Sequence, residues 1–264
     1  MLIAAVQLRS TDQVESNLNR VASLVAEAAH RGAALVALPE NFAYLRSEGE
    51  DIGYHQSLDG ELADWLKQLA QKHGISLLAG SFPETAPNQK VFNTSLLFGP
   101  DGQQLALYRK VHLFDVTLPD GTVLEESRFV EPGQELVTVT IDDVCFGLSI
   151  CYDLRFPELY RQLTAQGAQV LFIPAAFTLQ TGKDHWEILL RARAIENQVY
   201  VVAPAQFGQH TPKRASYGRA MIIDPWGMVL ATAPDRECFI MADIDTGHLA
   251  RIRKAMPCLL HRRM

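Results

Sequence analysis

Three side chains that could together perform covalent catalysis each follow an apolar, strand-like run of the sequence. Glu40 follows the run ending in LVALP, Lys110 follows LALYR, and Cys151 follows VCFGLSI. A thiol can act as a nucleophile, a carboxylate as its general base, and an ammonium group as a stabiliser of a developing oxyanion. Any one of these residues alone is more commonly an inert buried thiol or a solvated surface charge. Their repeated position at strand ends predicts one shared site.

The cysteine occupies the most informative position of the three. Cys151 lies between a strand-like run and the segment Tyr152 to Pro157, which leads into a helix. Free backbone N–H groups and the positive end of a helix at such an elbow favour a thiolate and can bind an oxyanion. The backbone N–H of Tyr152 is the candidate oxyanion donor beside Lys110.

The elements that must position these residues alternate between strand and helix. Apolar runs predict strands over 2–8, 33–38, 75–82, 91–98, 103–109, 136–141, 144–150, 168–174 and 200–205. Helical spacing predicts helices over 14–28, with Asp12 as N-cap, and over 61–73, 184–198 and 246–255, with another starting near Pro157. Residues 112–131 show no clear period. No linker-like stretch divides the chain, and the hairpins argue against a purely parallel barrel. We therefore expect one α/β domain, residues 1–264, with two mixed sheets covered by helices.

Composition narrows the function classes. The chain has 264 residues, 48% of them hydrophobic and 20% charged, with a formal net charge of −6. This balance indicates a globular protein, and its acidity argues against nucleic-acid binding. No apolar run is long enough for a membrane helix. The four cysteines include no CxxC pair, so they predict neither a disulfide scaffold nor a metal site. We expect a cytoplasmic protein, in which such thiols stay reduced.

The sequence around the three residues resembles the nitrilase superfamily of carbon-nitrogen hydrolases from end to end. Glu40 in LPENF, Lys110 in YRKVHLFD and Cys151 in SICYDLRFPELYR match its Glu-Lys-Cys triad, and Glu126 in EES matches its second pocket glutamate. The segments HWEILLRARAIENQVYVVAPAQFG and KRASYGRAMIIDPWG and the tail HRR are similar to the Nit-type deaminated-glutathione amidases. The resemblance implies a four-layer α-β-β-α sandwich that forms a homodimer.

The resemblance also implies a reaction. A thioester formed on Cys151 would split amide hydrolysis into two steps, with deaminated glutathione yielding 2-oxoglutarate and cysteinylglycine and no metal or cofactor taking part. For the small anionic amide substrate, Arg155 is a candidate carboxylate partner, or else a structural ion-pair partner of Glu158 or Asp153. Further candidate substrate-binding residues are Tyr44, Phe177, Thr181 and His185. The alternatives are an omega-amidase for 2-oxoglutaramate or 2-oxosuccinamate, a nitrilase proper, and a non-catalytic binding protein on the same scaffold.

Overall fold

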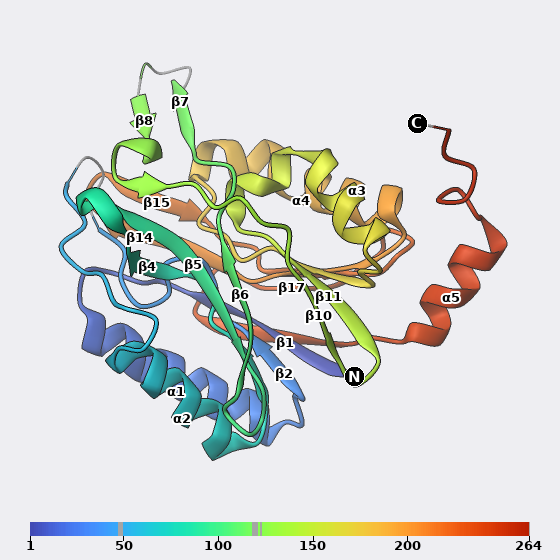
Figure 1. Cartoon of the computed structure of the whole chain (residues 1–264), viewed down its shortest axis with the longest axis horizontal. Helices are drawn as coiled ribbons and strands as arrows, with labels where there is room; N and C mark the ends of the chain where they lie inside the picture. Colours follow the sequence, from blue (N-terminus) through green and yellow to red (C-terminus); the bar gives the residue numbers. More distant parts are fainter. Residues whose placement is uncertain (47–49, 118–120, 122, 264) are drawn as a thin grey trace.

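Two β-sheets lie face to face between two pairs of helices (Figure 1). The computed structural model describes residues 1–46, 50–117, 121 and 123–263. Helices α1 (Val14–His30) and α2 (Glu61–His73) cover one outer face, and α3 (Pro157–Ala165) and α4 (Leu179–Asn197) cover the other. The predicted four-layer α-β-β-α arrangement is confirmed.

The first sheet has ten strands drawn from both ends and the middle of the chain. They are β1 (Leu2–Leu8), β2 (Leu35–Ala37), β3 (Ser76–Leu78), β4 (Phe82–Thr85), β5 (Val91–Phe98), β6 (Gln104–Arg109), β9 (Val130–Glu131), β14 (Ala205–Thr211), β15 (Arg214–Tyr217) and β18 (Cys238–Asp243). Strand β1 lies parallel to β2 and β14 and antiparallel to β18, so the sheet is mixed, as predicted.

The second sheet has six strands, in the order β10, β11, β12, β13, β16, β17. They are β10 (Thr138–Ile141), β11 (Val144–Leu148), β12 (Val170–Phe172), β13 (Tyr200–Ala203), β16 (Met221–Ile223) and β17 (Val229–Thr232). A separate hairpin joins β7 (Asp115–Thr117) to β8 (Val123–Glu125), and α5 (Thr246–Ala255) extends away from the layers (Figure 1). Three short 3₁₀ turns complete the elements: Pro87–Gln89, Glu126–Arg128 and Cys151–Arg155.

Strand β1 is apolar on both faces because helices cover one face and the second sheet covers the other. In β1, Ile3 and Ala5 belong to the core between the two sheets, whereas Ala4 and Val6 belong to the core beneath α1 and α2. This alternation follows from the two-residue period of a strand. A strand buried on both sides therefore appears in the sequence as a continuous hydrophobic run.

Three local expectations were wrong. Asp12 is not the N-cap of α1, because Gln13 occupies that position without a side-chain capping bond. Helix α4 begins at Leu179, earlier than predicted, because the hydroxyl of Thr178 accepts a hydrogen bond from the N–H of Thr181. The run 200–205 is not one strand: β13 ends before Pro204, and β14 begins after it in the other sheet.

The predicted site residues follow strands of both sheets. Glu40 follows β2 and Lys110 follows β6 in the first sheet, whereas Cys151 follows β11 in the second. Gly133 allows the chain to pass close to Lys110, since a Cβ on Gly133 would lie 2.1 Å from the carbonyl oxygen of Arg109. The site therefore forms where two independently hydrogen-bonded sheets meet.

Candidate active site

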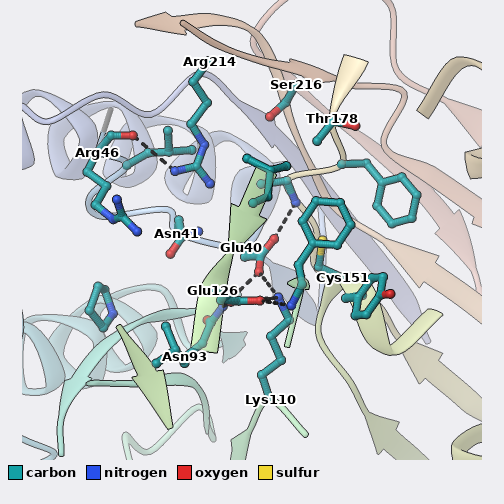
Figure 2. Close-up of a pocket in the computed structure, with 18 of the residues that line it drawn as sticks. Glu40, Asn41, Arg46, Asn93, Lys110, Glu126, Cys151, Thr178, Arg214 and Ser216 are labelled. Carbon is teal, nitrogen blue, oxygen red and sulfur yellow. Dashed lines mark hydrogen bonds and ion pairs between the residues drawn. The ribbon is translucent and has the colours of Figure 1, made fainter. Parts of the chain in front are cut away.

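Glu40 lies at the centre of the site and is almost fully buried (Figure 2). Its Oε1 accepts hydrogen bonds from Lys110 Nζ at 3.1 Å and Asn93 Nδ2 at 2.9 Å. Its Oε2 accepts one from the backbone N–H of Ala176 at 2.8 Å, and its carboxylate also interacts with the thiol of Cys151. One carboxylate thus contacts both sheets and the other two predicted catalytic residues.

Glu126 is a second carboxylate that pairs with the Lys110 ammonium. The Lys110 ammonium donates to both carboxylate oxygens of Glu126, at 2.8 and 3.0 Å. Glu126 is held in turn by the backbone N–H of Phe114 at 2.7 Å and by Asn93 Nδ2 at 3.4 Å. The structure therefore brings Glu126 into contact with Lys110, while its neighbour Glu125 makes no contact with that ammonium among the described residues.

Cys151 occupies a sharp turn between β11 and α3. Its backbone has a φ of +48°, a left-handed conformation that is uncommon for a residue with a side chain and typical of strained functional turns. The Cys151 N–H donates to the carbonyl of Pro174 at 2.9 Å, so this amide is already used. Tyr152 is the next residue of the turn, and the first amides of a helical turn have no acceptor within that turn.

The three charged and ionisable groups control one another's protonation. Burial disfavours the ionised form of Glu40, but the Lys110 ammonium and the hydrogen bonds from Cys151, Lys110 and Asn93 hold the Glu40 pKa below its usual 4.5. Burial also opposes the charge on Lys110, yet Glu126 and Glu40 raise its pKa well above the usual value. Glu40 and Lys110 therefore form an ion pair.

The thiol behaves differently from the sequence-based expectation. Burial first and the Glu40 charge second raise the Cys151 pKa well above its usual value, and the opposing effect of Lys110 is smaller. The expectation that the turn favours a thiolate was therefore wrong, because burial and the charge of Glu40 outweigh the opposing effect of Lys110. This protonation state suits a general base that takes the thiol proton during attack.

Asp153 fixes the turn that carries Cys151. Its carboxylate accepts from Tyr108 OH at 2.6 Å and the Ile150 N–H at 2.8 Å. It also accepts from the N–H of His112 at 3.0 Å and lies 2.7 Å from the His112 Nδ1. Tyr108 and His112 stand two residues before and after Lys110, so one fully buried carboxylate joins the segments that carry the lysine and the cysteine.

A pocket of about 360 Å³ opens above these groups. Tyr44, Phe177, Thr181 and Arg155 all line it, as does Tyr152. Arg155 forms no ion pair with Asp153 or Glu158 among the described residues; its guanidinium lies over the rings of Tyr152 and Phe177. Its position therefore favours the substrate-facing interpretation over the structural ion pair.

His185 lies outside the pocket lining. It is exposed on α4, and its Nδ1 lies 3.3 Å from Arg155 Nη1. The structure therefore places Thr181, but not His185, in the pocket with the other predicted substrate-binding residues.

Three site contacts were missed by sequence reasoning. Asn93 lies within β5, Ala176 contributes only a backbone N–H, and Asp153 lies in the turn quoted for Cys151. A polar residue inside the apolar run VFNTSLLF was a usable signal for Asn93. Nothing in a sequence indicates which backbone N–H faces a carboxylate far along the chain.

Fold and site together define a carbon-nitrogen hydrolase. The model of the carbon-nitrogen hydrolase family matches residues 2–254, and the chain belongs to this family. It is accordingly a hydrolase of amide C–N bonds. Within the described residues, no group of three His, Cys, Asp or Glu side chains could hold a metal ion, and no helix is long and apolar enough to cross a membrane.

Individual relatives narrow the comparison. The chain is 48% identical over 265 aligned positions to the deaminated glutathione amidase of Synechocystis, covering 99% of this chain and 97% of that protein. The mouse deaminated glutathione amidase is 42% identical, with 99% and 83% covered. The crystal structure of the Caenorhabditis elegans NitFhit protein superposes with a TM-score of 0.93 at 41% identity, covering 99% of this chain and 65% of that chain.

Proposed function

We propose that this protein is a thiol amidohydrolase that cleaves deaminated glutathione into 2-oxoglutarate and cysteinylglycine, a reaction of metabolite repair. The observation that carries the proposal is the Glu40 carboxylate, which contacts Lys110 and Cys151 at the base of one pocket. Near-full-length relatives that are named deaminated glutathione amidase support the choice of substrate.

The first half-reaction forms a thioester. Glu40 takes the thiol proton as the Cys151 sulfur attacks the amide carbonyl carbon, and the resulting oxyanion is stabilised by Lys110 and the backbone N–H of Tyr152. The tetrahedral intermediate collapses when Glu40 returns that proton to the departing amine of cysteinylglycine. Removal of one such oxyanion donor typically costs about 2.7–4 kcal/mol in the transition state.

The second half-reaction releases the acid. Glu40, again ionised, takes a proton from a water molecule whose oxygen attacks the thioester carbonyl. The C–S bond breaks, the sulfur recovers a proton from Glu40, and 2-oxoglutarate leaves. Glu126 holds Lys110 in place through both steps, because it accepts two hydrogen bonds from the lysine ammonium.

The direct test is hydrolysis of deaminated glutathione, 2-oxoglutaramate and a simple nitrile by the purified protein, with products identified by mass spectrometry. Cysteinylglycine is the expected product, and Cys151→Ala should abolish its release while leaving thermal unfolding cooperative. An omega-amidase is the second candidate function, since Arg155 suits any 2-oxo acid. The omega-amidase function replaces the proposed one if only 2-oxoglutaramate is cleaved.

Arg155 is proposed to bind the carboxylate of the 2-oxo acid, because its planar guanidinium can donate two parallel hydrogen bonds to a carboxylate. Tyr44, Phe177 and Thr181 are proposed to enclose the same part of the substrate. We predict that Arg155→Leu raises KM for 2-oxo acid amides about tenfold or more, with a much smaller effect on neutral amides. Steady-state kinetics on both substrate types checks this, and equal effects contradict the carboxylate role.

A homodimer of a single carbon-nitrogen hydrolase domain, residues 1–264, is proposed as the working form. Large apolar side chains are exposed on neighbouring parts of α4 and the β16–β17 turn, namely Ile188, Ile195, Trp226 and Met228. A second copy covering them would remove apolar area from water. Light scattering of the native protein tests whether it is a dimer.

Free cysteines and a thiol-dependent site suit a reducing compartment such as the cytoplasm.

A further inference from the structure

Among the described residues that line the pocket, cations outnumber carboxylates, although the chain as a whole is acidic. The whole chain carries a formal net charge of −6. The described residues that line the pocket include five cations and three carboxylates: Arg46, Lys110, Arg155, Lys213 and Arg214, with Glu40, Glu125 and Glu126. This excess of two positive charges is concentrated in a concave site, where it attracts anions more strongly than on an open surface.

The cations fall into separate groups. Lys110 is paired with Glu40 and Glu126 at the base. Arg155 belongs to the wall that carries Cys151, because its guanidinium lies over the rings of Tyr152 and Phe177. Lys110 is thus the proposed catalytic ammonium, and Arg155 is the proposed partner of one substrate carboxylate. Three further cations are found among the described residues of the lining.

The remaining three form a second group, here termed the distal cation cluster: Arg46, Lys213 and Arg214. Lys213 and Arg214 come from the β14–β15 hairpin, and Arg46 comes from the segment after β2. Arg214 Nη1 donates to the carbonyl oxygen of Arg46 at 3.2 Å, which joins the two segments. In Figure 2, Arg46 and Arg214 lie on one side of the pocket and Cys151 lies on the other, with Glu40 and Asn41 between them.

The proposed substrate has its charges arranged in the same way. Deaminated glutathione carries one carboxylate on the 2-oxo acid and a second on the glycine, with the scissile amide between them. We propose that the distal cation cluster binds the glycine carboxylate and selects dianionic peptide-like amides over small 2-oxo acid amides; this inference rests on the proposed function. Guanidinium and ammonium groups form strong charge-assisted hydrogen bonds with carboxylates.

The cluster is anchored to the protein by contacts that leave the catalytic groups untouched. The Arg46 guanidinium lies over the ring of Phe129, 4.3 Å from its centroid, and donates to the backbone carbonyl of Glu50. A purely structural role for these cations would change the rates of all substrates alike. A role in recognition changes only the rate of substrates that carry the distal carboxylate.

The experiment compares three substrates: deaminated glutathione, its C-terminal glycinamide analogue and 2-oxoglutaramate. Wild-type protein should have a kcat/KM about tenfold or more higher for the acid than for the glycinamide. In Arg214→Gln and Lys213→Gln, this preference should fall severalfold through KM, while kcat/KM for the other two substrates stays unchanged. Lys72→Gln, on the exposed face of α2, is the control for loss of a cation elsewhere.

The outcomes separate this inference from the proposed function. If wild-type protein does not cleave deaminated glutathione, both proposals are wrong. If it cleaves the acid and the glycinamide equally well, the substrate assignment stands and the distal subsite is wrong. Equal losses on all three substrates in the Arg214 and Lys213 variants, with an unchanged unfolding temperature, also overturn the subsite.

Discussion

At the scale of single residues, Glu40 has two opposite effects on Cys151. Its charge raises the thiol pKa, after burial, and so keeps the sulfur protonated. Its own pKa is depressed by Lys110 and by its hydrogen bonds, so it stays ionised above about 4.5, the unperturbed value, and remains available as a base. The site therefore keeps the thiol in its less nucleophilic protonated form, beside a carboxylate that stays ionised.

This coupling predicts an unusual response to Glu40→Gln. Loss of the negative charge should lower the Cys151 pKa, so alkylation by iodoacetamide should begin at lower pH than in the wild-type protein. Amide turnover should nevertheless fall by about 100-fold or more, because no general base remains. The pH dependence of the alkylation rate, corrected with Cys151→Ala for the other thiols, provides the measurement. An unchanged or higher thiol pKa would contradict the coupling.

At the scale of elements, two segments that follow strands of different sheets must be held in fixed positions relative to each other. Lys110 lies directly after β6 and Cys151 lies in the turn after β11, and the Asp153 carboxylate accepts hydrogen bonds from both segments. The His112 ring also stacks on Phe156, with centroids 3.6 Å apart, which adds a second contact between them. We infer that Asp153 is a positioning residue that acts through these neighbours.

Asp153→Asn tests that role. The amide cannot accept all the donors that face the carboxylate, and each buried donor left unpaired costs about 1–3 kcal/mol of unfolding free energy. We expect a destabilised protein in which kcat falls with KM nearly unchanged, because the pocket wall remains but the sulfur and ammonium lose their alignment. Tyr108→Phe removes one donor and should have a smaller effect on both. Denaturant unfolding and steady-state kinetics measure these effects, and a KM effect alone would refute positioning.

At the scale of the whole molecule, the site exists because two covered sheets pack face to face. Neither sheet contains all three groups: Glu40 and Lys110 follow strands of the first, and Cys151 follows a strand of the second. The chain also switches sheets at Pro204, so β14 returns beside β1, and its partner β15 brings Arg214, with Lys213 just before it, to the pocket. Packing between the sheets thus brings together both the proposed nucleophile with its charged neighbours and the distal cation cluster.

A buried histidine at this junction makes stability depend on pH. His210 in β14 contacts the carbonyl oxygen of Ser10 at 2.8 Å and the hydroxyl of Ser216 at 2.9 Å. Burial lowers its pKa from 6.5 to about 4, despite the hydrogen bond to Ser10. Between these values the unfolded chain binds the additional proton, so this contribution to stability rises with pH across the window and is lost as pH falls toward 4.

The total effect should be about 3 kcal/mol, from the shift between the two pKa values. Urea unfolding at a series of pH values from 4 to 7 should show this dependence in the wild-type protein. In His210→Gln the slope should be shallower, whereas His30→Gln, at an exposed position of α1, should retain it. Equal slopes in the wild-type protein and His210→Gln would show that another group is responsible.

The sequence by itself determined the chemistry available and much of the framework. Glu40, Lys110 and Cys151 were recognisable because each follows an apolar run, and the resemblance in their flanking residues indicated the family and the four layers. Hydrophobic periodicity is a local signal, so it also located most strands and helices. It could not assign strands to sheets: residues 200–205 look continuous, yet Pro204 separates two strands that pair in different sheets.

Only the tertiary structure decided the contacts between distant segments. Asn93 and Ala176 reach Glu40 across 53 and 136 residues, and nothing local indicates either pairing. The raised pKa of Cys151 likewise depends on burial and on the charge of Glu40, both of which arise when the sheets pack together. A sequence shows which groups can react, but their protonation and alignment depend on an environment supplied by residues far away along the chain.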